Sequence, residues 1–279
     1  MKRNILIVLL LLFNLSLFAA DTFTINGRDI TVPVPQGYVR VTDDMTLGKR
    51  YLQQIDEPMN DTLATYIMES DVPAAMAGEM PSLERTFALK VNKELRNITI
   101  GKNDFSELKS LLKEYYQKLT EEKTKALISE PVNDLSQEVS QEFDVDIDIN
   151  ISQVVHLESH FEDENAIAFS MYFNTEVSAK EFDIVGVDEN SVTTTCLNTA
   201  GPVLLLYSYA SKDELDWTRS ASISWAKSVM ASNSQPPVKS PRRGIDWNKA
   251  VEVGLSGAIG GGLFVLLLTR IATLFKRNK

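Results

Sequence analysis

The chain has 279 residues, 44% of them hydrophobic and 24% charged, with a formal net charge of −10. Residues 21–238 carry 18 Lys and Arg against 36 Asp and Glu, a net charge near −18. Such a surface repels phosphate backbones and anionic headgroups, which argues against nucleic-acid binding. It favours basic partners, although acidity that merely keeps the domain soluble is the simpler explanation.

The first twenty residues have the layout of a secretory signal peptide. Two basic residues at positions 2 and 3 precede an apolar block over residues 5–18, and Ala19-Ala20 follows. We therefore expect the chain to be exported. Leu17 or Phe18 stands three residues before the cleavage site, where a small residue is preferred, so an uncleaved N-terminal anchor is the alternative.

Residues 21–231 are expected to form one exported domain. No Pro/Gly/Ser-rich break divides this stretch. Its length suffices for a sizeable hydrophobic core. Cys196 is the chain's one cysteine. No intrachain disulfide is therefore expected even in an oxidising compartment, and stability has to come from the core.

The N-terminal half of this domain predicts strands around one long helix. Residues 22–25 and 28–32 flank Asn26-Gly27, a two-residue turn suited to a tight hairpin. Further strands are expected over residues 63–68 and 85–91. A capping-box pattern at residues 104–107 and Leu and Tyr at helical spacing predict a helix over 105–128, which Pro131 should end.

The second half predicts a central antiparallel sheet. Apolar residues occupy odd positions 145, 147, 149, 151, 155 and 157, and polar residues occupy even positions 146, 148, 150, 152, 156, 158 and 160, the period of a half-buried strand. A strand over 166–174 should return beside it, and strands over 182–187, 192–197 and 203–209 should follow. A helix is expected from about residue 211 to 230. The fold class expected is α+β, an antiparallel sheet packed by two or three helices, plus a C-terminal transmembrane helix.

The order of these elements resembles the PsbP-like fold family. The shared features are the strand hairpin, the Pro-x-Gly-Tyr turn of residues 35–38, the central sheet and a closing strand-to-helix unit over 203–230 that contains Trp217 and Trp225. Members of that family serve mostly as extrinsic subunits or accessory factors of larger assemblies. The resemblance therefore implies a binding role here, and it carries over no functional residue.

The C-terminal region predicts a stalk and a membrane anchor. Residues 232–249 are Pro-rich, residues 253–269 carry no charge, and a basic end follows over residues 276–279. About twenty apolar residues are enough to cross a bilayer, so we expect a transmembrane helix over 250–275 with its basic end in the cytoplasm. A buried soluble helix is the alternative, which the adjacent glycines at 260–262 would weaken.

Small residues recur along the predicted anchor at helical spacing. Gly257 and Gly261 form a GxxxG pattern, and Gly254, Ala258 and Gly262 form a second row. Such rows let two helices approach closely in a membrane. They make a homo-oligomer through this helix possible, although glycine is also common in membrane helices that do not pair.

His156 and His160 are the chain's two histidines, and they lie in the predicted strand over 145–161 with Glu158 between them. Alternate residues of a strand share one face, so these three side chains are candidate ligands for zinc or copper. A solvated sheet face is the simpler alternative. The run HLESH does not match the HExxH zincin pattern, and no GxSxG, Walker or GxGxxG motif occurs. No cofactor is predicted.

The function expected is that of a non-enzymatic accessory or interaction protein of a bacterial envelope complex. It would be a single-pass protein of the inner membrane, with its ectodomain in the periplasm and other envelope or membrane proteins as partners. A metal-binding protein or metal-dependent enzyme using His156, Glu158 and His160 is the alternative. A sensor that signals through the anchor is a third hypothesis, and the four-residue cytoplasmic end makes it hard to support.

Overall fold

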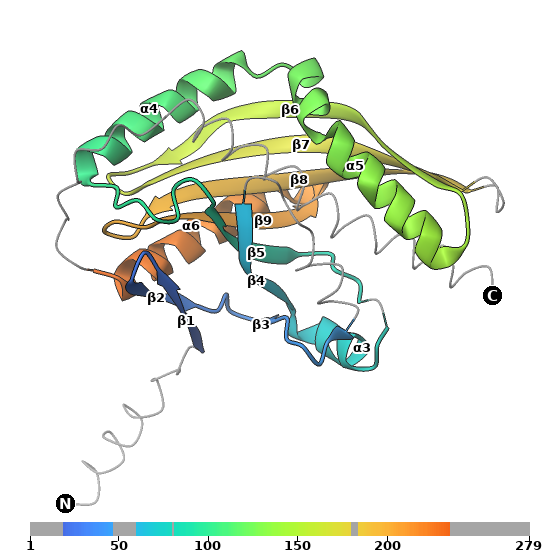
Figure 1. Cartoon of the computed structure of the whole chain (residues 1–279), viewed down its shortest axis with the longest axis horizontal. Coiled ribbons are helices and arrows are strands. Elements are labelled where there is room, and N and C mark those ends of the chain that lie inside the picture. The colour runs from blue at the N-terminus through green and yellow to red at the C-terminus, as the bar shows by residue number, and fades with distance from the viewer. Residues whose placement is uncertain (1–18, 47–59, 80, 180–183, 235–279) are drawn as a thin grey trace, which may run out of the picture.

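The computed structural model describes residues 19–46, 60–79, 81–179 and 184–234 (Figure 1). Its main strands are β3 (Tyr38–Arg40), β4 (Asn60–Met68), β5 (Thr86–Asn92), β6 (Ile147–Glu162), β7 (Ala166–Ala179), β8 (Ile184–Asn198) and β9 (Val203–Ser211). They form one sheet in the order β3-β4-β5-β9-β8-β7-β6. Every pairing in it is antiparallel, as expected.

The N-terminal hairpin is formed as the sequence predicts. Strands β1 (Ala20–Ile25) and β2 (Arg28–Pro33) pair in a separate two-stranded sheet. The turn between them places Asn26 at φ 50° and Gly27 at φ 70°. These are the two residue types that enter this left-handed region most readily, so the turn sequence fixes the register of the hairpin.

Helices cover both faces of the large sheet. Helices α4 (Lys102–Lys118) and α5 (Glu121–Phe143) lie over one face, and α6 (Leu215–Ser232) packs on the other face with the β1–β2 hairpin (Figure 1). The short elements are η1 (Glu69–Asp71), α3 (Val72–Met76) and η3 (Lys212–Glu214). The α+β class with a few packed helices is therefore confirmed.

The predicted single helix over 105–128 is wrong, because the chain breaks at Leu119-Thr120. Thr120 caps α5 by accepting a hydrogen bond from the backbone N of Lys123 at 3.3 Å. Helix α4 begins earlier than expected, with Gly101 as its N-cap and no side-chain cap. Pro131 lies inside α5 rather than at a helix end, and contacts with β6 hold the helix beyond it.

The alternation of buried and exposed side chains along β6 is interrupted. Ile147, Ile149 and Ile151 are buried, but a register shift follows between Ile151 and Gln153. After it Val154 is buried, whereas Val155 is 38% exposed. The extra residue of such a bulge moves the side chains that follow it to the other face, up to the next irregularity. A second irregularity lies between Leu157 and Phe161.

Helix α5 covers the outer edge of β6 with polar side chains. Ser140 Oγ accepts a hydrogen bond from the backbone N of Ile147 at 2.9 Å, and Ser136 Oγ accepts one from Ile149 at 3.1 Å. Lys125 Nζ donates to the carbonyl of Ser152 at 2.6 Å. An uncovered edge strand is a template for pairing with another chain, so these contacts protect the sheet.

None of the helices in the described ranges combines the length and the hydrophobicity that a membrane span requires. The predicted transmembrane helix over 250–275, its small residues and the basic end over 276–279 lie outside those ranges. So do the predicted signal peptide up to residue 18 and the predicted stalk after Ser234.

Candidate functional site

His156 lies on the α4/α5 face of the sheet, because the first bulge of β6 turns it there. Its Nε2 is 2.8 Å from Thr124 Oγ1 of α5, and its ring meets Tyr116 of α4 edge-on at 5.3 Å. Burial lowers the pKa of this imidazole below its usual range. At neutral pH the ring is uncharged, and it joins β6 to the two helices above it.

His160 contacts the opposite side of the sheet. Its Nδ1 is 3.4 Å from Ser170 Oγ, which also accepts a hydrogen bond from Arg219 Nε of α6 at 3.4 Å. Burial, together with the charge of Arg219, lowers the pKa of His160 to about 4. Glu158, between the two histidines, is exposed.

The three predicted metal ligands therefore do not share a face. The second irregularity of β6, between Leu157 and Phe161, separates His156 from His160, so the assumption of strict alternation is wrong at this point. Over the described ranges, no three His, Cys, Asp or Glu side chains gather closely enough to hold a metal ion. Cys196 is buried, and burial raises the pKa of its thiol to about 12, as expected for a packing residue.

The structure instead presents a groove that the sequence did not predict. This aromatic groove is a cavity of about 560 Å³ between α6 and the segment that joins β2 to β3. Pockets of roughly 300–1,000 Å³ with apolar walls are typical binding sites. The residues that line it are Ala20, Pro33, Val34, Pro35, Gln36, Tyr38, Phe87, Trp217, Ala221, Ser224, Trp225, Ser228 and Ser232.

Four aromatic rings build one end of the aromatic groove. Phe87 of β5 is central: it meets Tyr38 edge-on at 4.7 Å, Trp225 at 5.2 Å and Trp217 at 5.6 Å. Trp225 Nε1 donates to the carbonyl of Pro33 at 2.8 Å, which holds the β2–β3 segment against α6. Edge-to-face contacts and this hydrogen bond make the wall rigid.

Charged groups lie beside this aromatic end. The guanidinium of Arg85 stacks over the Trp217 ring at 4.9 Å, and its Nε donates to Glu214 Oε1 at 2.9 Å. Burial raises the pKa of Tyr38 to about 12; Arg85 opposes the shift, and Glu214 and Asp71 add to it. The Tyr38 hydroxyl is therefore protonated at neutral pH and can donate a hydrogen bond.

The rest of the groove follows a small-residue stripe on α6, formed by Ala221, Ser224, Ser228 and Ser232. These positions recur at three- or four-residue spacing and so lie on one side of the helix. The hydroxyls of Ser228 and Ser232 donate to carbonyls one turn back, at 3.1 and 3.0 Å. The stripe therefore leaves a shallow, largely apolar trough.

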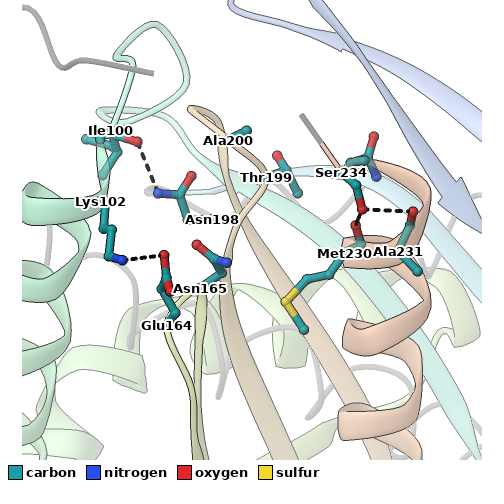
Figure 2. A pocket seen from close by; sticks show the side chains of 12 residues that line it. Ile100, Lys102, Glu164, Asn165, Asn198, Thr199, Ala200, Met230, Ala231 and Ser234 are labelled. Carbon is teal, nitrogen blue, oxygen red and sulfur yellow. Dashed lines mark hydrogen bonds and ion pairs between the residues drawn. The ribbon is translucent and has the colours of Figure 1, made fainter. Parts of the chain in front are cut away.

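A second, smaller cavity of about 270 Å³ lies where α4 begins and α6 ends (Figure 2). Lys102 and Glu164 form an ion pair of 2.7 Å across it. Asn198 Nδ2 donates to the carbonyl of Ile100 at 3.0 Å, and its Oδ1 accepts from Gly201 N at 2.9 Å. Because these polar groups already bond one another, the aromatic groove is the stronger candidate site.

Sequence reasoning missed the groove because its walls come from distant segments. Pro33 and Trp225, which are hydrogen-bonded, are 192 positions apart. The available signal was the pair of prolines at 33 and 35 together with two tryptophans eight positions apart on one helix. Nothing in either stretch indicates that they meet.

No protein-family model and no curated protein matches the chain. Among solved structures, the chain is similar to the solution structure of cyanobacterial PsbP (CyanoP) from Synechocystis sp. PCC 6803. That likeness has 12% sequence identity and a TM-score of 0.26, and it covers 78% of this chain and 94% of the other. The protein matched is a PsbP, and the PsbP-like family is the one that the order of elements resembles.

Proposed function

We propose that this protein is a membrane-anchored, extracytoplasmic interaction protein of a bacterial envelope complex, and that the aromatic groove is its binding surface. The groove is the observation that carries the proposal. Its walls are aromatic rings, prolines and small side chains, and Tyr38 is the titratable side chain among its lining residues. Such a surface gains free energy by burying apolar area, about 25 cal/mol per Å², while a few polar groups orient what binds.

The sequence outside the described residues supplies the rest of the proposal. Residues 1–20 would export the chain, 232–249 would form a stalk, and 250–275 would cross the inner membrane with residues 276–279 in the cytoplasm. The rows formed by Gly254, Gly257, Ala258, Gly261 and Gly262 would allow this helix to pair with itself or with a partner's helix. The acidic domain would then face the periplasm.

Anchoring is tested by extracting membranes with alkaline carbonate. We expect the full-length protein to stay in the membrane pellet, because a transmembrane helix does not wash off. A tag fused after Lys279 should resist protease added outside intact cells or spheroplasts. Release of the protein by carbonate, or cleavage of the tag from outside, would contradict the proposed topology.

The groove is tested by photo-crosslinking in intact membranes. A photoreactive amino acid at Ser224 lies in the aromatic groove, whereas one at Lys227 is also exposed on α6 but does not line it. We expect Ser224 to give an adduct with a discrete envelope protein that Lys227 does not give. Equal adducts from both positions, or none from Ser224, would count against the groove as the binding surface.

A further inference from the structure

We propose that the aromatic groove is occupied in the resting protein by this chain's own residues 235–244, QPPVKSPRRG. This segment follows the described residues directly. The inference rests on the proposed role of the groove as a binding surface and adds its resident occupant. The residue types of the segment, its length and its charge each support the proposal.

The chemistry of the segment fits the walls. It contains Pro236, Pro237 and Pro241 within ten residues. Proline-rich segments favour an extended polyproline II conformation, which loses little entropy on binding and docks on grooves lined by aromatic rings. The rings of Tyr38 and Trp217 form such a wall, and the Tyr38 hydroxyl can donate to a carbonyl of the incoming segment.

The segment also has the right length and starting point. Ser232 lines one end of the aromatic groove and Trp217 lines the other. The fifteen helical steps between them span about 22 Å. Ten residues of polyproline II at roughly 3.1 Å each reach about 31 Å, so the segment can reverse after Ser234 and still span the groove.

The charges of the segment favour docking in this reversed direction, back along α6 from Ser232 toward Trp217. A segment that runs back along α6 brings Arg242 and Arg243 toward the aromatic end, where the two carboxylates of Glu214 and Asp71 outnumber the one guanidinium, Arg85, among the charges that act on the pKa of Tyr38. The domain as a whole is strongly acidic, near −18 over residues 21–238. A basic segment tethered to it is attracted rather than repelled.

Tethering raises the local concentration of the segment. A short linker gives an effective concentration in the millimolar range, so even weak docking is well populated. Any partner segment of similar chemistry then has to displace residues 235–244. The docked state would also hold the domain nearer the membrane than an extended stalk of about 40 Å would.

Engineered cysteine pairs in the full-length, membrane-embedded protein test the proposal. Allowing two residues for the reversal, Ser240 comes to lie near Ser224 of the groove. The test pair is Ser224→Cys with Ser240→Cys, and the matched control is Lys227→Cys with Ser240→Cys. Lys227 is exposed, closer in sequence to the tether, and about 100° round α6 from Ser228. The native Cys196 is buried.

We expect an intramolecular disulfide to form in the test pair at least about tenfold faster than in the control, as judged by mass and non-reducing mobility. Replacing the three prolines by glycine in the test pair should bring its rate down to the control level. Equal rates in the two pairs would overturn the proposal, and disulfide-linked dimers would instead assign the groove to a second copy's segment.

Unfolding curves of each variant check that the fold is intact, since Ser224 and Lys227 are exposed. The outcome is separable from the proposed function. An envelope-protein adduct from a photoreactive residue at Ser224 can form whether or not this disulfide does. If both inferences hold, the triple proline replacement should increase the yield of that adduct by removing the internal competitor.

Discussion

The two faces of the sheet are built by different means. On the α6 face, hydroxyls form a connected layer between helix and strands: Thr193 Oγ1 lies 2.9 Å from Ser170 Oγ and 3.0 Å from Thr218 Oγ1, and Thr195 Oγ1 lies 2.6 Å from Ser222 Oγ. On the α4/α5 face the core is apolar, and among the described residues Tyr116 Oη and His156 Nδ1 lack a hydrogen-bond partner. On the other side of the sheet His160 Nε2 also lacks one within the same residues.

The difference shows which contacts fix the position of a helix on this sheet. Buried hydroxyls that bond each other fix one position of α6, because any shift would leave donors unpaired. That fixed helix can serve as the wall of a binding groove. Away from the edge strand β6, the α4/α5 face depends on apolar packing, which tolerates small shifts better than a hydrogen-bonded layer does.

The largest expected effect is on the α6 face, at Trp225. This side chain is 3% exposed, contacts Phe87 and Tyr66 edge-on, and donates to the carbonyl of Pro33. Trp225→Ala should lower the free energy of unfolding by about 3–5 kcal/mol, measured by chemical denaturation. Trp217→Ala is the control, with a smaller loss because that ring is partly exposed. Equal losses would show that Trp225 is not the wall's main support.

A smaller effect is expected from acid, through His160. Its folded-state pKa of about 4 lies below the ordinary value near 6.5, so the unfolded chain binds the proton more tightly. Stability should therefore fall as the pH drops from 6.5 to about 4, and this contribution should be constant below that. Because the ring is partly exposed, solvent screening reduces the loss to about 1–2 kcal/mol.

The measurement compares wild type with His160→Gln by denaturation at pH 7 and pH 5. Carboxylates titrate in both proteins, so the difference between the two isolates the histidine. We expect the wild type to lose more stability than the variant over this interval. The same loss in both would show that His160 does not titrate as its burial and the nearby Arg219 imply.

A third effect tests the covered edge of β6. Ser140→Ala removes the acceptor for the backbone N–H of Ile147, and should cost about 1 kcal/mol because water can partly replace it. Hydrogen exchange of the Ile147 amide should become faster. Ser129→Ala on the same helix is the control, since Ser129 is exposed and bonds only within α5 among the described contacts. An unchanged exchange rate would show that Ser140 does not protect the edge.

The sequence predicted the parts of this fold that depend on local chemistry. The Asn26-Gly27 hairpin and the antiparallel order of strands follow from turn residues and alternation. The expected strands over 182–187 and 192–197 are one continuous strand, β8, and β7 extends five residues beyond its predicted end. Strands β7 and β8 pair with each other along these extensions, which stabilises them. The residue pattern of one strand does not show how far its neighbour extends.

The candidate site was the least predictable part, for two physical reasons. A bulge in β6 depends on how that strand pairs with β7, so the opposite placement of His156 and His160 has no local signature. The aromatic groove needs β2, β5 and α6 to meet, which is a property of the assembled core. The sequence places Trp217 and Trp225 on one predicted helix, but it does not indicate which segments these side chains face.

The smallest expected effect is that of Tyr116→Phe on the α4/α5 face. It is compared with Tyr66→Phe, which changes a buried tyrosine on the other face. Tyr116 Oη has no hydrogen-bond partner among the described residues, whereas Tyr66 Oη donates to Asp21 Oδ2 at 2.8 Å. Removing a buried, unpaired hydroxyl is nearly neutral, because its desolvation cost disappears with it. Tyr116→Phe should therefore change the free energy of unfolding by no more than about 0.5 kcal/mol, in either direction.

The matched variant Tyr66→Phe should cost about 2 kcal/mol, since it leaves the carboxylate of Asp21 without its phenol donor. Denaturation curves of the two variants, recorded beside wild type, give both numbers. A large loss in Tyr116→Phe would reveal a hydrogen bond at that hydroxyl, and the α4/α5 face would then be held by polar contacts as the α6 face is.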